Sequence, residues 1–191
     1  MNIQDSDALI VVDVQNDFCP GGALGITEGD AVVPLINTLT PRFKTRVFTR
    51  DWHPPDHCSF AEEPAFMDGS WPQHCVAGTK GAEFHADLTV PDDAHVISKA
   101  TDPEAEAYSG FQDTDLADRL RSRGVTRVFV CGLATDYCVK QTAIDARAAG
   151  FETVLIEDGC RGVDYPAGSA LQAIADMEAA GVQRAQSGEL R

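Results

Sequence analysis

The sequence predicts an α/β fold in which a mainly parallel sheet carries helices on both faces. Apolar runs typical of buried strands alternate with helical patterns along the whole chain, and this alternation is characteristic of parallel strands joined by right-handed crossovers. The chain has 191 residues, of which 43% are apolar. It can therefore bury a complete sheet core as one domain, residues 1–191, without a linker or an internal repeat.

The expected strands are short runs of aliphatic and β-branched residues. In chain order they cover residues 8–15, 46–51, 95–100, 127–131, 153–158 and 182–185. The first four carry or precede side chains that can do chemistry: Asp13, Asp51, Lys99 and Cys138. Ligands of a parallel sheet bind beyond the carboxyl ends of its strands, where the strand order reverses. If the first four strands lie in the order 3-2-1-4, these side chains meet at that edge.

Helical patterns occupy most of the intervals between the strands. The expected helices cover residues 28–39, 115–123, 136–149 and 166–180. Thr27 is a suitable cap for the first helix, whose start is made less regular by Pro34. Thr135 or Asp136 can cap the third helix, and Gly150 stands where a left-handed C-terminal residue is favoured. Apart from the last short strand, the tail from residue 183 is expected to be surface chain.

Cys138 falls in the first turn of the third expected helix, directly after a buried strand. Unpaired backbone N–H groups and the positive end of the helix dipole favour a thiolate at this place. Cys138 is therefore a candidate nucleophile at neutral pH. The alternative is a buried and inert cysteine, because free cysteine is commonly a small core residue.

Asp13 and Lys99 are the candidate partners of this thiol. A buried strand rarely contains a carboxylate, so Asp13 is either a catalytic acid or base, the cap of a turn, or the partner of a structural cation. Lys99 at a strand end is either a solvated lysine or a group whose long stem reaches toward Asp13. With Cys138 on the other side of Asp13, the three form a workable nucleophilic site.

A second constellation suggests a metal site. Asp51 and His53 can point the same way from an extended backbone because residues i and i+2 share a face. His74 adds a further imidazole, and His57 is another candidate. Two histidines and one aspartate suit Zn²⁺, Fe²⁺ or Mn²⁺. The alternative is hydrogen bonding within the loop, but three of the five histidines lie in this one aromatic segment.

The segment of about residues 52–90 has no convincing periodicity. A connection of this length inside a compact domain is usually a functional lid or binding loop, so we expect it to line the site. Phe18 and Leu24 in the loop after the first strand are candidate pocket walls. The Gly21–Gly22 pair in the same loop is interpreted as turn chemistry, since it lacks the pattern of a phosphate-binding loop.

Composition limits the class of partner. The formal net charge is −15, which disfavours nucleic acid and anionic membrane surfaces. A small or neutral molecule is the expected partner, and association into a homo-oligomer is left open. The six cysteines form no C-x-x-C pair, so we expect reduced thiols and a cytoplasmic protein. No apolar run approaches the roughly 18 residues of a membrane span, and the first residues lack the charge pattern of a signal peptide.

The motifs that carry these residues also resemble a known family. The chain is similar to the nicotinamidases, also called pyrazinamidases, of the isochorismatase-like cysteine hydrolases. The resemblance extends from about residue 8 to 163. It is carried by VVDVQNDFCPGGAL (11–24), DWHPPDHCSF (51–60), SWPQHCV (70–76), AYSGF (107–111) and GLATDYCV (132–139).

This resemblance implies a three-layer α/β/α fold with a six-stranded sheet in the order 3-2-1-4-5-6. It also implies a catalytic triad of Asp13, Lys99 and Cys138, with a non-proline cis peptide before Ala134 and an oxyanion hole at Ala134 and Cys138. The implied metal ligands are Asp51, His53 and His74, and His57 matches a residue that only some relatives use. The implied substrate-binding residues are Phe18, Leu24, Trp71, Tyr108, Ala134 and Tyr137.

The implied reaction is hydrolysis of nicotinamide, and also of pyrazinamide, in NAD salvage. Cys138 would attack the amide carbonyl, Asp13 would move protons, and a divalent ion would hold the pyridine nitrogen. Three alternatives stay open at this stage. They are a related hydrolase of isochorismate or an N-carbamoyl compound, an amidase that uses metal-bound hydroxide, and a binding module without activity.

Overall fold

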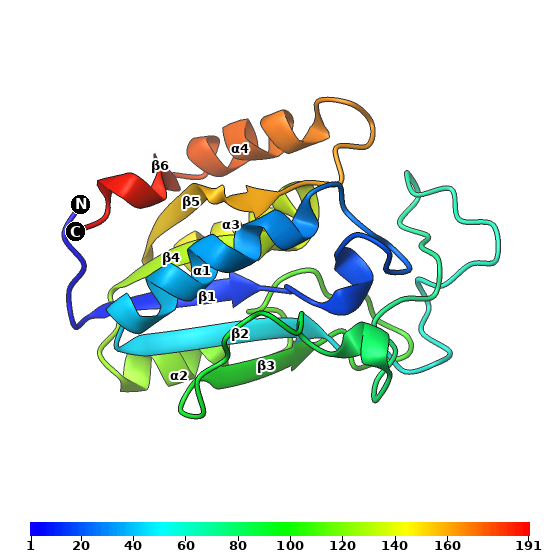
Figure 1. Ribbon diagram of the computed structural model, residues 1–191, viewed down its shortest axis with the longest axis horizontal. Helices are drawn as coiled ribbons and strands as arrows, with labels where there is room; N and C mark the ends of the chain where they lie inside the picture. Colours follow the sequence, from blue (N-terminus) through cyan, green and yellow to red (C-terminus); the bar gives the residue numbers. More distant parts are fainter.

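A computed structural model describes residues 1–191 and contains one six-stranded parallel sheet (Figure 1). Its strands are β1 (Asp7–Val12), β2 (Thr45–Asp51), β3 (His95–Lys99), β4 (Arg127–Leu133), β5 (Glu152–Arg161) and β6 (Gln183–Ala185). They lie in the order β3-β2-β1-β4-β5-β6, and every neighbouring pair is parallel. The predicted fold class and strand order are confirmed.

Helices cover both faces of this sheet. They are α1 (Val33–Leu39), α2 (Leu116–Ser122), α3 (Lys140–Ala148) and α4 (Ser169–Ala179). In Figure 1, α1 crosses the front of the sheet while α2 and α3 lie behind it, and α4 packs against α3. Single turns of 3₁₀ helix occur at Asn16–Phe18, Gly29–Val32, Thr40–Arg42, Lys80–Ala82 and Ser187–Glu189, and one π-helical turn, η5, spans Thr135–Val139.

The two central strands, β1 and β4, form the most deeply buried part of the sheet. All six residues of β1 are buried, as expected for a strand with helices on both faces. The strands approach closely at Gly132, which pairs with Val12 and has a φ of +118°. A Cβ on Gly132 would lie 2.1 Å from the carbonyl oxygen of Val12, so only glycine fits. This close pairing sets Asp13, the next residue, against the loop that follows β4.

Several predicted helix ends are wrong. The expected helix over 28–39 is a 3₁₀ turn followed by α1, because Glu28 has a left-handed φ of +56° and Pro34 opens the α-helical part. Thr27 therefore caps nothing. The expected helix over 166–180 begins only at Ser169, since Gly168 before it has a left-handed φ of +92°.

Neither Thr135 nor Asp136 caps the helix that follows β4, contrary to the prediction. The N-cap residue of η5 is Ala134, and no side chain caps the turn. The Asp136 carboxylate instead accepts hydrogen bonds from the backbone N–H groups of Val163 and Asp164 and from the hydroxyl of Ser169. Asp136 thus joins η5 to the start of α4. Gly150 does have the predicted left-handed conformation, with a φ of +94°.

Residues 52–94 connect β2 to β3 and contain little regular structure, as predicted. Beyond one 3₁₀ turn, the segment is ordered by isolated bridges that pair His53 with Val76 and Phe60 with Trp71. It projects from the carboxyl ends of the strands, on the right in Figure 1. The chain has no helix with the length and apolar character needed to cross a membrane.

The tail after residue 183 is more ordered than surface chain, which corrects the prediction. Leu190 is buried against the core, and the backbone of Arg191 exchanges hydrogen bonds with Met1 and Ile3. The two termini therefore lie side by side, at the end of the sheet opposite the long loop (Figure 1).

Candidate active site

Three strand ends bring Asp13, Lys99 and Cys138 together. Asp13 follows β1, Lys99 is the last residue of β3, and Cys138 lies in η5 after β4. The ammonium nitrogen of Lys99 is 2.9 Å from Oδ2 of Asp13 and 3.4 Å from Sγ of Cys138. To reach Asp13 from β3, the aliphatic part of Lys99 crosses β2. Its ammonium group also pairs with Asp51, the last residue of β2. One buried cation therefore contacts two carboxylates and the thiol.

Burial and charge divide the roles of the two carboxylates. Burial raises the pKa of Asp13, and this effect outweighs the opposing pull of Lys99. Burial also acts to raise the pKa of Asp51, but there Lys99 and His53 dominate and the pKa is lower than usual. Burial alone would lower the pKa of Lys99, yet Asp13 and Asp51 hold it well above its ordinary value. Lys99 therefore stays an ammonium with Asp51 as its ionised partner, and Asp13 is the carboxylate that takes up a proton more readily.

Burial opposes the thiolate that the helix N-terminus favours at Cys138. Burial raises the pKa of the thiol well above its ordinary value; Lys99 opposes this effect, and the charges of Asp13 and Asp51 add to it. A helix N-terminus contributes only about 0.3–1 kcal/mol, which is too little to offset removal from water. The resting side chain is a thiol, and it needs a base to become a nucleophile.

Asp13 is placed to be that base. A carboxylate oxygen of Asp13 lies within 4.8 Å of Sγ of Cys138. Oδ1 accepts a 2.6 Å hydrogen bond from the hydroxyl of Thr49. Oδ2 contacts Lys99 as an ion pair but lies outside hydrogen-bonding geometry, so it is a buried acceptor without a hydrogen-bond donor. That oxygen can accept the thiol proton.

Backbone amides border the thiol on the other side. The peptide bond between Leu133 and Ala134 is cis, as the resemblance implied. Ala134 lines the same pocket as Cys138, and its N–H group makes no hydrogen bond within the protein. Cys138 is in the first turn of the helical segment, where amides have few partners within the helix. These amides are available to stabilise a negative oxygen.

Asp51, His53 and His74 form a cluster beside the thiol. One ligand atom from each lies within 4.8 Å of the others, and all three side chains are buried. Nε2 of His53 is 3.6 Å from Asp51, and both ring nitrogens of His53 are buried without a hydrogen-bond partner. Nδ1 of His74 donates to the carbonyl oxygen of Pro72, and burial lowers the pKa of His74, which keeps the ring neutral. Unpartnered nitrogens and one carboxylate at this spacing fit a divalent metal.

His57 is not part of that cluster. Its ring packs on His53 with 4.2 Å between centroids, but its Nδ1 lies 2.8 Å from the hydroxyl of Ser59 and its Nε2 lies 3.2 Å from the carbonyl oxygen of Ala105. Both nitrogens therefore have partners within the protein. His57 instead groups with His53 and Glu106.

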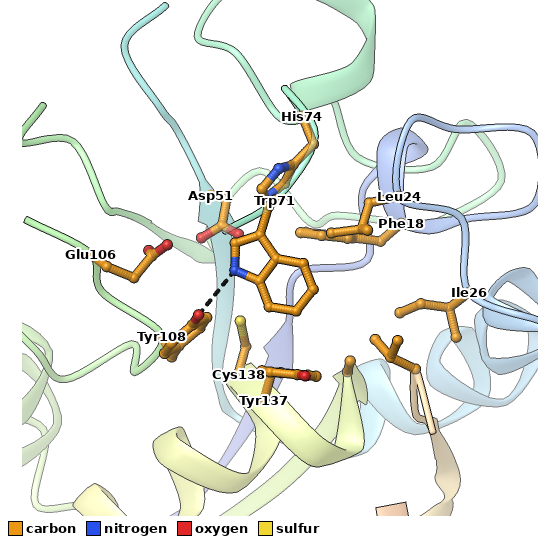
Figure 2. A pocket seen from close by; sticks show the side chains of 12 residues that line it. Phe18, Leu24, Ile26, Asp51, Trp71, His74, Glu106, Tyr108, Tyr137 and Cys138 are labelled. Atoms are coloured by element: carbon orange, nitrogen blue, oxygen red, sulfur yellow. Dashed lines mark hydrogen bonds between the residues drawn. The ribbon is translucent and has the colours of Figure 1, made fainter. Parts of the chain in front are cut away.

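Cys138 and Asp51 line a small pocket, nine of whose twelve lining residues are hydrophobic (Figure 2). Its walls include all six residues that the sequence predicted for substrate: Phe18, Leu24, Trp71, Tyr108, Ala134 and Tyr137. The indole N–H of Trp71 donates a 3.0 Å hydrogen bond to the hydroxyl of Tyr108, and its ring meets Tyr137 edge to face at 4.9 Å. Such a small aromatic cavity suits a flat molecule with few polar groups.

Sequence reasoning missed several residues of the site. Ile26, Glu106 and Val163 also line the pocket. The side-chain amide of Gln15 accepts a hydrogen bond from the backbone N–H of Asp51 and donates to the carbonyl oxygens of Asp51 and Ala82. Gln15 thereby fixes the end of β2. No pattern marked these residues, because the contacts that define them come from distant segments.

The parallel sheet brings a thiol, a carboxylate and an ammonium group together at its strand ends. This is the architecture of an α/β cysteine hydrolase. Residues 7–187 match the family model described as Isochorismatase domain. The chain therefore belongs to the isochorismatase family.

Close relatives carry more specific names. A nicotinamidase of Acinetobacter baylyi is 42% identical over 94% of this chain and 92% of its own length. The pyrazinamidase of Pyrococcus horikoshii, solved in complex with zinc, has a TM-score of 0.87 and 48% identity over 95% of this chain and 99% of that one. PnC1 from L. infantum, solved in complex with nicotinate, has a TM-score of 0.91 and 40% identity over 100% and 98% of the two chains.

Proposed function

We propose that this chain is a nicotinamidase that hydrolyses nicotinamide to nicotinate and ammonia, and that also accepts pyrazinamide. The observation that carries the proposal is the position of Cys138, in reach of Asp13 and Lys99 at the wall of a small aromatic pocket. Relatives named nicotinamidase and pyrazinamidase, at 42% and 48% identity, support this substrate class. NAD salvage is the proposed context, because the reaction returns the pyridine ring as its acid.

The reaction begins with proton transfer from the thiol to Asp13. As the proton leaves, Lys99 stabilises the thiolate from 3.4 Å, and Sγ of Cys138 attacks the amide carbonyl carbon. The C=O bond becomes a C–O⁻ bond in a tetrahedral intermediate. The N–H groups of Ala134 and Cys138 donate to this oxygen, and each donor of this kind is worth roughly 3 kcal/mol in enzymes from which one has been removed.

Collapse of the intermediate breaks the C–N bond. Protonated Asp13 gives its proton to the leaving nitrogen, so ammonia departs and a thioester remains on Cys138. Asp13, again a carboxylate, then accepts a proton from water as the water oxygen attacks the thioester carbonyl. The C–S bond breaks, the proton returns to sulfur, and the acid is released. One water is consumed for each amide hydrolysed.

The chain's own residues also explain how the ring is held. Phe18, Trp71 and Tyr108 surround the cavity, and the hydrogen bond between Trp71 and Tyr108 keeps two of these rings in place. Asp51, His53 and His74 would bind a divalent ion such as Zn²⁺, Fe²⁺ or Mn²⁺. When bound, this ion supplies a Lewis acid for the pyridine nitrogen and serves as a template for the substrate.

The test is to incubate the metal-replete protein with nicotinamide and to measure ammonia and nicotinate, with and without a chelator. We expect both products in equal amounts and a large loss of rate after chelation. Absence of ammonia from the metal-replete protein would overturn the proposal. Isochorismate and an N-carbamoyl amine, assayed in parallel, test the related hydrolase activities.

The Cys138→Ser variant separates the thiol mechanism from attack by metal-bound hydroxide. The thiol mechanism requires loss of at least about 10³-fold in kcat, since the serine hydroxyl is a far weaker nucleophile at the same place. A variant that keeps most of the activity would favour the metal-hydroxide route. Cys58→Ser is the matched control, because Cys58 is exposed and outside the pocket.

A further inference from the structure

Glu106 is a pocket carboxylate that the proposed reaction does not use. It lies in the connection between β3 and α2, two residues before Tyr108, and its side chain points into the pocket toward Asp51 (Figure 2). One carboxylate oxygen accepts a 2.8 Å hydrogen bond from the backbone N–H of Ala107. No side chain from elsewhere in the chain hydrogen-bonds to the carboxylate or pairs with it. This carboxylate faces an aromatic cavity and can accept further hydrogen bonds. Polar groups in such surroundings usually have a hydrogen-bond donor.

The ring of His53 lacks hydrogen-bond partners. Both of its ring nitrogens are buried and without hydrogen-bond partners, and the side chain is 1% exposed. Nε2 faces Asp51 at 3.6 Å, on the side of the metal cluster. A ring that binds a metal through one nitrogen nearly always donates the other N–H to a carboxylate, a carbonyl or a water. Nδ1 of His53 has no such acceptor among its direct contacts.

The Glu106 carboxylate and the His53 ring are separated by a distance that one bridging water molecule can span. Ligand atoms of His53, His57 and Glu106 lie within 4.8 Å of one another. The carboxylate makes no direct hydrogen bond to His53, whereas two hydrogen bonds of about 2.8 Å through one water span a gap of this size. His57 is not available as the acceptor, because Ser59 and Ala105 already occupy its two nitrogens.

We propose that Glu106 is a positioning residue of the metal site and that, through one water molecule, its carboxylate accepts the N–H of His53. This inference rests on the metal half of the proposed function. It gives His53 a fixed ring orientation and a fixed tautomer. It also places a second carboxylate near the metal ligands, where Asp51 already pairs with Lys99. Loss of such a partner typically lowers metal affinity about 10–100-fold.

Zn²⁺ affinity in the absence of substrate tests the proposal. Each protein is titrated against a chromophoric chelator, and the His74→Ala variant reports Zn²⁺ held elsewhere, for example by the six thiols. Glu106→Gln keeps the shape of the side chain and removes its charge. Glu104→Gln removes the same charge from an exposed position in the same loop. We expect at least about tenfold weaker Zn²⁺ binding for Glu106→Gln and no change for Glu104→Gln, with activity of Glu106→Gln restored by higher free Zn²⁺.

Equal Zn²⁺ affinities for Glu106→Gln and Glu104→Gln would overturn the proposal. A crystal structure of the Zn²⁺-loaded wild-type protein is the second measurement, and it should contain a water within hydrogen-bonding distance of both Glu106 and His53. A structure without that water would also contradict the assignment. Because no substrate enters the Zn²⁺ titration or the crystal structure, a negative result in these two measurements leaves nicotinamide hydrolysis standing. Absence of ammonia from the wild-type protein would remove the proposed function without changing the Zn²⁺ comparison.

Discussion

The site has two halves that are built in different ways. The strand half consists of Asp13, Lys99 and Cys138, which stand on or directly after β1, β3 and β4. The loop half consists of His53, Trp71 and His74, which belong to the long connection between β2 and β3. Asp51 lies between the halves, since it pairs with Lys99 and groups with the two histidines.

The difference lies in what holds each half in place. The register of the sheet sets Asp51 directly opposite Lys99 and keeps β1 between β2 and β4, so the strand half is as rigid as the core. The loop half belongs to no strand of the sheet and is held by isolated bridges, by hydrogen bonds from the loop backbone to neighbouring segments, and by contacts of its own aromatic side chains. In the proposed function, the strand ends thus carry the chemistry, while the loop supplies pocket walls and the two histidines of the metal site. Changes in the strand half should remove catalysis and stability together, and changes in the loop half should remove binding while the fold persists.

Lys99→Met should have the largest effect. It leaves the buried carboxylates of Asp13 and Asp51 facing each other without a cation, and loss of one partner of a buried ion pair costs about 3–5 kcal/mol. Activity should fall by at least about 10³-fold. Denaturant unfolding and initial rates measure the two effects, with the exposed Lys44→Met as control. An active and fully stable Lys99→Met protein would refute the assignment of the strand half.

His74→Ala should reduce kcat/KM by about 100-fold while the free energy of unfolding of the metal-free protein changes little. The reason is that His74 belongs to the loop half and its removal takes away a metal ligand without disturbing the sheet. Metal content by elemental analysis, steady-state kinetics and thermal unfolding check the prediction. His85→Ala, in the same loop but outside the pocket, should behave as wild type. Unchanged metal content in His74→Ala would contradict the ligand set.

The rate of alkylation of Cys138 should rise about tenfold for each pH unit between pH 7 and pH 9. A raised pKa means that the thiol form dominates at neutral pH and that the reactive thiolate fraction grows as pH approaches the pKa. Iodoacetamide labelling with peptide mass spectrometry measures this rate, and exposed Cys58 is an internal reference. A labelling rate that is already constant below pH 7 would instead indicate the thiolate expected from the helix N-terminus alone.

Trp71→Phe should have the smallest effect, about a fivefold rise in KM with little change in kcat. The variant keeps an aromatic wall and loses only the hydrogen bond from the indole to Tyr108, and one such bond is worth about 1 kcal/mol. Trp52→Phe is the control, because Trp52 stacks on Arg50 outside the pocket. A fall in kcat as large as that expected for Lys99→Met would show that the loop half also takes part in the chemical step.

Prediction from the sequence succeeded where periodicity and local chemistry agree. Buried strands such as 127–131 were recognisable from their apolar runs, and the strand order implied by the family resemblance is the one observed. Helix starts were less accurate. Thr135 and Asp136 are good caps by composition, but Asp136 binds the loop before α4, a contact that only the tertiary structure creates. Gln15, Glu106 and Val163 gave no local signal for the same reason.

By itself, the sequence determined the α/β class and the residues at the carboxyl ends of the strands, because these follow from side-chain pattern and chain direction. The order of the six strands came from the resemblance of its motifs to a known family. Only the tertiary structure decided the protonation of the site. Burial and the crossing of β2 by the Lys99 side chain place one cation among two carboxylates and a thiol. This arrangement raises the pKa of the Cys138 thiol and that of Asp13, the base of the proposed reaction. The physical reason is that pKa values depend on desolvation and on charges within a few ångströms, and both are set by residues far apart in the chain.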